Sequence, residues 1–390
     1  MSIRPILFLL LCGLIGCFNP GATRAQAPAT TISDQPGPVE DVVRVNTRVV
    51  FIDTLVRDKK TGAPVTDLAL QSFQVLDDGK PRNLSYFSRE GVTRRPLALM
   101  LVLDLSTSGI LYLERPEVME HIITALAKLR PEDEIGVMQI WYEPQAAPLT
   151  FEMRSKTVSV LTRDRAQTFA ALRDVQQFAK QNLPQVKILF GSFKDLFKAA
   201  WKIGIAGAAT GMPAGPPPII ITAARDLEYM IDKAPLLARE RPDSQVVIME
   251  VTDDLGAEGF GKSRKTAHEL IDSGVTVSGM VVKRTLMDKA VNVTGTIMSP
   301  LLGVRFHTIS YYGKQTGGEV ETVGRPEEFA GAVDKIVSGL AARYSLGFTL
   351  DEGERNDERV HQLEVKINPR GTTRKLTVSA RRSYVPKAQP

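Results

Sequence analysis

The chain has 390 residues, of which 43% are hydrophobic and 24% are charged. This is the composition of an ordinary folded protein with room for two or three domains, and it argues against large-scale disorder. The formal net charge of +5 is small, and the absence of a long Lys/Arg run, a zinc-finger motif or an RNA-binding motif argues against a nucleic-acid partner.

Residues 1–27 are predicted to be a signal peptide. Arg4 supplies a positive charge, and residues 6–16 form an apolar run that is too short to cross a bilayer as a helix. Two processing sites compete: Leu14-Ile15-Gly16-Cys17 fits a lipobox with a lipidated Cys17, and Ala25-Gln26-Ala27 fits an ordinary cleavage site. Either processing site predicts that the protein is exported and becomes a periplasmic protein, an outer-membrane lipoprotein or a secreted protein.

Both cysteines, Cys12 and Cys17, lie in this leader. The mature chain is therefore expected to have no disulfide, no cysteine nucleophile and no thiolate metal site, although its compartment would permit a disulfide. Residues 28–40 are rich in Pro, Ser and Thr and are predicted to be a linker.

In two separated segments, apolar and polar residues alternate as they do in β-strands. In the N-terminal segment, 41–92, an Asp-Gly turn predicts a hairpin over 75–80. The C-terminal segment, 344–386, has too few strands to form a stable sandwich alone. We therefore predict one small antiparallel β domain built from both ends of the chain. One face of its first strand is expected to carry Val43, Val45, Thr47, Val49 and Phe51.

Residues 96–343 alternate between buried strands and helices, which predicts a doubly wound, mostly parallel α/β sheet. The apolar run 97–103 ends at Asp104 and is typical of a strand buried on both faces. The other strands are expected at 135–141, 246–251 and 275–282, and helices at 116–129, 163–180, 222–239, 265–272 and 326–343.

Asp104, Ser106 and Ser108 follow the first buried strand directly. Ligands of open α/β sheets bind just beyond the carboxyl ends of the strands. One carboxylate and two hydroxyls at alternate positions offer hard oxygen donors, which suit Mg²⁺, Mn²⁺ or Ca²⁺ and suit zinc or copper poorly. The alternative is that these residues only form a turn and a helix N-cap.

This pattern resembles the von Willebrand factor A domain, a Rossmann-type fold, and its metal-ion-dependent adhesion site. The sequence VVIMEVTDD resembles the family's strand followed by Thr-Asp-Gly, so it supplies Asp253, with Asp254 in place of the glycine. Thr222 opens TAARDLEYM, which is similar to the helix that carries the family's threonine. The resemblance implies that Ser106, Ser108 and Thr222 contact the ion directly. It also implies that Asp104 and Asp253 act mainly through water, and that a coordination position stays open for a partner's carboxylate.

Three further blocks extend the resemblance to about residues 42–386. They are FQVLDDGKPRNLSYFS over 73–88, TGGEV over 316–320 and ARYSLGFTL over 342–350. Together they resemble an A-related domain family widespread in Acidobacteria, which joins an N-terminal β segment, an A domain and a β tail.

These features predict a non-enzymatic, cation-dependent adhesion or protein-binding module of the cell envelope, holding Mg²⁺ (or Mn²⁺/Ca²⁺). One alternative is a structural envelope protein with a degenerate or purely structural metal site. Another is a metal-assisted hydrolase, for which the carboxylates Glu250, Asp253, Asp254 and Glu258 are the candidates, although no second motif supports it. The sequence does not indicate the oligomeric state.

An insertion at 182–218 has an aromatic stripe, Phe193, Phe197 and Trp201, beside a stripe of lysines. A helix over 192–203 would either pack its aromatics onto the domain, which we favour, or contact a membrane surface or a partner. The histidines lack metal-ligand spacing and are interpreted as structural or solvated: His121, His268, His307 and His361.

Overall fold

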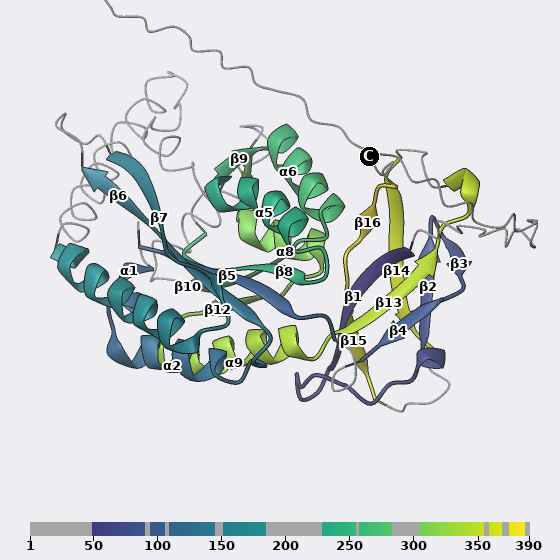
Figure 1. Cartoon of the computed structure of the whole chain (residues 1–390), viewed down its shortest axis with the longest axis horizontal. Coiled ribbons are helices and arrows are strands. Elements are labelled where there is room, and N and C mark those ends of the chain that lie inside the picture. The colour runs from purple at the N-terminus through teal and green to yellow at the C-terminus, as the bar shows by residue number, and fades with distance from the viewer. Residues whose placement is uncertain are drawn as a thin grey trace, which may run out of the picture. The chain divides into compact units, whose positions relative to one another are not determined.

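A six-stranded sheet forms the centre of the larger part of the molecule, the α/β domain (Figure 1). The computed structural model describes residues 49–89, 94–105, 109–144, 151–184, 228–254, 257–282, 304–354, 359–368 and 374–386. Within them the strand order is β12-β10-β8-β5-β6-β7, and only β7 runs antiparallel to its neighbour. The strands are β5 (Leu97–Asp104), β6 (Glu134–Pro144), β7 (Phe151–Thr162), β8 (Gln245–Thr252), β10 (Thr276–Val282) and β12 (Val320–Val323).

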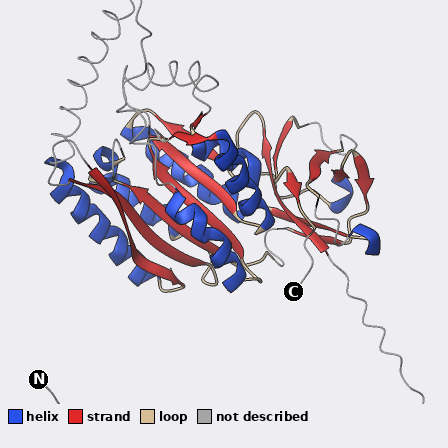
Figure 2. Cartoon of the chain, turned by 90° about the horizontal axis from the view of Figure 1, so that it is seen from above, coloured by secondary structure: helices blue, strands red, loops and turns tan. Residues whose placement is uncertain are grey.

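Helices cover both faces of this sheet, which explains the uninterrupted apolar runs (Figure 2). In β5, Leu97, Leu99, Leu101 and Leu103 enter one core, and Ala98, Met100 and Val102 enter the other. The first face packs against α1 (Ile110–Leu113), α2 (Pro116–Leu126), a helix over 165–184 and α9 (Phe329–Ala341). The second packs against α5 (Glu228–Glu240), α6 (Phe260–Asp272) and α8 (Thr308–Thr316).

The chain ends build a separate antiparallel β domain, as predicted. Two four-stranded sheets, β15-β1-β13-β4 and β16-β14-β2-β3, share one apolar core. N-terminal β1 lies between C-terminal β13 and β15, and β2 pairs with β14. The strands are β1 (Val49–Asp58), β2 (Phe73–Asp77), β3 (Lys80–Arg82), β4 (Tyr86–Ser88), β13 (Tyr344–Thr349), β14 (His361–Ile367), β15 (Leu376–Ser379) and β16 (Ser383–Tyr384).

Short elements complete the described chain. Two three-residue strands, β9 (Ala257–Gly259) and β11 (Val304–Phe306), pair with each other. The 3-10 helices are η1 (Leu70–Ser72), η2 (Pro326–Glu328) and η3 (Glu352–Glu354). No helix in the described ranges is both long and apolar enough to cross a membrane.

The fold class and the Asp-Gly hairpin are confirmed. Asp78 and Gly79 connect β2 to β3 with φ of 49° and 79°, the two left-handed residues of a tight hairpin turn.

At the start of β1, the face that carries Val49 and Phe51 is the more exposed one. Val50 and Ile52 enter the core, whereas Phe51 is 37% exposed and packs edge-on against Tyr86. From Val49 onward both faces of β1 carry apolar residues, so alternation alone does not decide which face is buried.

The regular elements that were not predicted include β7, α8 and β12. Strand β7 is an edge strand in which Ser159 is buried and its neighbour Val160 is exposed, so the apolar residues do not mark the buried face. Helix α8 carries β-branched residues and a glycine, which are poor helix formers, so its local signal is weak.

Several predictions concern residues outside the described ranges. They include the signal peptide 1–27 with Cys17, the linker 28–40, the helix 192–203 and nearly all of the insertion 182–218. The exact domain boundaries also stay predictions.

Candidate functional site

Asp104 and Asp253 lie at the carboxyl ends of two adjacent parallel strands. Asp104 ends β5 and Asp253 directly follows β8, and the register between these strands aligns Leu103 with Val251. The chain leaves β5 toward β6 and leaves β8 toward β10, on opposite sides, so the strand order reverses between them. Open α/β sheets bind their ligands at such a switch point. Two of the five predicted ligands are therefore together at the expected edge.

The other three predicted ligands, Ser106, Ser108 and Thr222, lie outside the described residues. The residues flanking the first two are described. Leu105 donates its N–H to Ile140 O at 2.7 Å. Gly109 lies against the end of β5, where an added Cβ would clash with the Asp104 carbonyl oxygen. A side chain at position 109 would therefore displace the loop or the strand end.

Thr252 connects the two strand ends. Its hydroxyl donates to Asp104 Oδ2 at 2.7 Å and accepts the N–H of Asp254 at 3.1 Å. The hydroxyl is buried, so both bonds are shielded from water. Thr252 thus fixes the orientation of the Asp104 carboxylate. Sequence reasoning did not single out Thr252, although its place directly before the strand-end aspartate was visible.

Glu250 adds a third carboxylate beneath the two aspartates. Its side chain is buried, and Oε1 has no hydrogen-bond partner among the described residues. Burial raises the pKa of Glu250 well above its usual range, and the nearby charges of Asp104, Asp254 and Asp253 raise this pKa further. The charges that act on Glu250 are thus themselves carboxylates.

Asp254, which stands where the resembling family has glycine, adopts a left-handed backbone with φ of 53°. Glycine favours this conformation, and aspartate tolerates it better than most residues. Oδ1 of Asp254 accepts the N–H of Ile309 at 3.1 Å in the first turn of α8. Burial nevertheless raises the pKa of Asp254 to about 7, and the carboxylate lies 3.7 Å from His307 Nδ1.

We call Asp104, Glu250, Asp253 and Asp254 the carboxylate rim. Each is at most 7% exposed. Buried carboxylates that repel one another are costly unless a cation neutralises them. A hard divalent cation fits this donor set, since carboxylate and hydroxyl oxygens are the ligands that Mg²⁺, Mn²⁺ and Ca²⁺ prefer. Asp104 and Asp253 are the described residues that would hold it.

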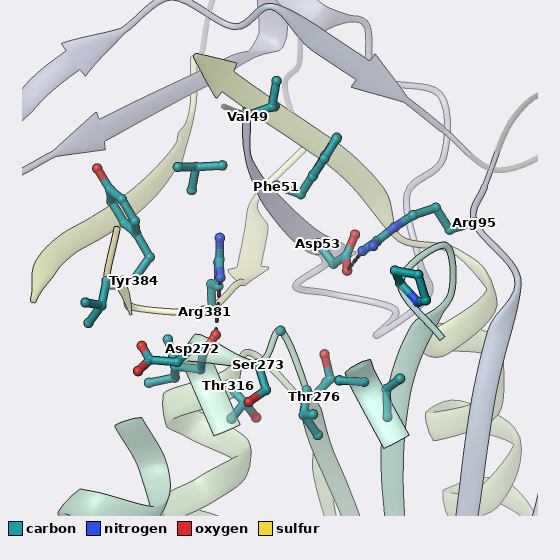
Figure 3. A pocket seen from close by; sticks show the side chains of 18 of the residues that line it. Val49, Phe51, Asp53, Arg95, Asp272, Ser273, Thr276, Thr316, Arg381 and Tyr384 are labelled. Atoms are coloured by element: carbon teal, nitrogen blue, oxygen red, sulfur yellow. Dashed lines mark hydrogen bonds and ion pairs between the residues drawn. The ribbon is translucent and has the colours of Figure 1, made fainter. Parts of the chain in front are cut away.

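A cavity of about 260 Å³ lies at the opposite edge of the sheet, between the amino ends of β8 and β10 and the β domain. Figure 3 shows Arg381 between the β-domain residues Phe51 and Tyr384 and the sheet-side residues Asp272 and Ser273. Ligand pockets usually measure about 300–1,000 Å³. This cavity is small by that standard, and we interpret it as part of the junction between the domains.

No family model and no curated protein matches this chain. Its fold is similar to solved von Willebrand factor A domains. The SpRpn10 VWA domain is 12% identical with a TM-score of 0.32, over 61% of this chain and 94% of that chain. A von Willebrand factor type A protein from Catenulispora acidiphila is 8% identical with a TM-score of 0.32, over 88% of this chain and 75% of that one.

The human COPII-coat protein Sec24c is 11% identical with a TM-score of 0.37, over 75% of this chain. The chain spans only 44% of Sec24c. Similarity at these levels carries no information about what this chain binds, so the functional argument rests on its own strand ends.

Proposed function

We propose that this chain is a non-enzymatic protein-binding module whose carboxylate rim holds a divalent cation, with Mg²⁺ as the first candidate. The ligands would be Asp104, Ser106, Ser108, Thr222 and Asp253. An acidic side chain of a protein partner would complete the coordination of the ion.

One observation carries this proposal: several buried carboxylates meet at the switch point of the sheet. Their mutual repulsion destabilises the folded protein. Burial and the charges of three aspartates raise the pKa of Glu250. A bound divalent cation would offset this repulsion and supply positive charge to attract a partner's carboxylate. The described residues would position the ion: Thr252 orients the Asp104 carboxylate, and Gly109 lies against the Asp104 carbonyl, where a larger residue would not fit.

Calorimetric titration with Mg²⁺ and Mn²⁺ tests the cation. We expect the wild-type protein to bind and Asp104→Asn to bind at least about tenfold more weakly, because the substitution removes a charge at the ion. The variant should still fold, since an asparagine oxygen can accept the Thr252 hydroxyl. Asp243→Asn, in an exposed turn before β8, is the matched control. Flat titrations, or equal binding by Asp104→Asn, would refute the cation site.

Adhesion requires a partner as well as an ion. A pull-down from envelope extracts tests this. Retention of one envelope protein in Mg²⁺, and loss of that protein in EDTA or with the Asp104→Asn variant, supports binding through the cation. Retention that is insensitive to EDTA supports a structural role for the site. We also propose that the chain is exported. The mass of the mature N-terminus distinguishes a lipidated Cys17 from cleavage after Ala27.

A further inference from the structure

A second group of potential metal ligands lies in the β domain. Asp77 ends β2, Asp78 follows it in the hairpin turn, and His361 opens β14, which pairs with β2. One donor atom from each of these residues lies within 4.8 Å of the other two. We call these three residues the β-domain triad. It is separate from the carboxylate rim. Asp77 and Asp78 lie in the predicted Asp-Gly hairpin, but the sequence did not indicate that they and His361 form a metal site.

Neighbouring groups fix which carboxylate oxygens face the histidine. Arg82 donates twice to Asp77 Oδ2, at 2.9 and 2.7 Å, and the Tyr384 hydroxyl donates to the same oxygen at 2.8 Å. The N–H of Gln362 donates to Asp78 Oδ1 at 2.8 Å. The other oxygen of each aspartate faces His361 Nδ1, at 3.6 Å for Asp77 Oδ1 and 3.0 Å for Asp78 Oδ2.

The buried, unpartnered oxygen of Asp77 is a second observation that points to a ligand at this place. Its side chain is only 1% exposed, and Oδ1 has no hydrogen-bond partner among the described residues. The separation of 3.6 Å from His361 Nδ1 is too long for a hydrogen bond. A buried carboxylate oxygen without a partner is unfavourable, and it points at the donors of the triad.

The spacing of these donors suits a metal ion. Two ligands at about 2.0–2.1 Å from a tetrahedral zinc ion lie roughly 3.3 Å apart. The observed 3.0 and 3.6 Å bracket that separation. An imidazole nitrogen favours zinc or a similar first-row ion over Mg²⁺, which prefers oxygen donors and water.

We propose that Asp77, Asp78 and His361 form a second metal site, for a first-row divalent cation of the Zn²⁺ type. The ion would connect the N-terminal hairpin to the C-terminal strand β14 and so hold together a β domain whose core is made from both chain ends. Asp78, with its side chain 45% exposed, gives the ion a path from solvent, and water completes the coordination.

Zinc titration of the full protein, with competition from a chelating dye, tests this site. We expect Asp78→Asn to weaken Zn²⁺ binding by roughly tenfold or more, because it removes a charged ligand. Asparagine tolerates the positive φ of this turn and can still accept the Gln362 N–H, so the hairpin is retained. His361→Gln should show the same loss. His268→Gln, an exposed histidine of α6, is the matched control and should bind as wild type does.

Stability gives a readout that does not depend on the dye. Zn²⁺ should raise the Tm of the wild type and of Asp104→Asn but not that of Asp78→Asn, since only the triad variant loses the connection between hairpin and strand. The result with Asp104→Asn separates this site from the carboxylate rim. Equal zinc affinity in wild type and Asp78→Asn, or no zinc binding at micromolar concentration, would overturn the proposal and leave an ordinary ion pair between His361 and Asp78.

Discussion

The two acidic clusters of this protein balance their charge in different ways. In the β domain, Arg82 and Tyr384 bind one oxygen of Asp77, and Arg82 also pairs with Glu354. In the carboxylate rim, the charges acting on Glu250 are three further carboxylates. Most of the charge in the β-domain cluster is thus balanced by neighbouring side chains, whereas the carboxylates around Glu250 raise its pKa and repel one another. Mutual repulsion between buried carboxylates is a better indicator of ligand binding than the number of carboxylates in a cluster.

Arg82→Met should produce the largest effect, because it removes the cation that neutralises the buried Asp77. Breaking a buried pair on one side leaves an uncompensated charge, and we expect a loss of about 3 kcal/mol of unfolding free energy in urea. Arg374→Met is the control: it breaks an exposed pair with Asp67 and should cost less than about 1 kcal/mol. Similar losses in both variants would mean that the difference between buried and exposed pairs is not decisive here.

Glu250→Gln should act in the opposite direction. It removes a carboxyl group whose ionisation is disfavoured in the folded protein while keeping the shape of the side chain, so we expect a gain of roughly 1–3 kcal/mol in EDTA at neutral pH. If the rim binds Mg²⁺ as proposed, the gain should shrink in Mg²⁺, because the bound cation would neutralise the carboxylates of the wild type. Urea denaturation with and without Mg²⁺ measures both values. Glu269→Gln on the exposed face of α6 serves as control. A loss of stability under both conditions would show that the Glu250 charge has a needed partner.

A smaller effect is expected from pH. Because the pKa of Asp254 is raised to about 7, the folded protein keeps a proton that the unfolded chain releases near pH 4. The folded state then binds more protons than the unfolded state between these values, so stability falls as pH rises from about 4 to about 7. In EDTA we expect wild type to lose about 2 kcal/mol more than Asp254→Asn between pH 5 and 7. Parallel pH profiles for the two proteins would contradict this account.

Much of the fold could be predicted because its signals are local. The run 97–103 is apolar on both faces, which is typical of a central parallel strand, and it forms β5. Asp78-Gly79 determines a tight turn by backbone conformation alone. The phase of β1 could not be predicted in this way, since Val50 and Phe51 are both apolar and only the partner strands select between them.

The same contrast between local signals and long-range pairing applies to the candidate sites. Asp104 and Asp253 were predictable because each follows a buried strand, and parallel strands bring their carboxyl ends together. The β-domain triad was not predictable, because His361 is separated from Asp77 by the whole α/β domain. Its histidine has no ligand spacing in the sequence, and only the pairing of β14 with β2 brings these residues together.

The way β1 is held has a consequence for folding. It lies between β13 and β15, and one of its side chains, Asp53, bonds Ser345, 292 residues further along the chain. Contacts of such long sequence separation form slowly. Strand β1 is therefore synthesised long before β13 and β15, and its apolar faces stay uncovered until those strands have formed. A truncation that removes β13 onward would leave an aggregation-prone strand beside a sheet that had already folded.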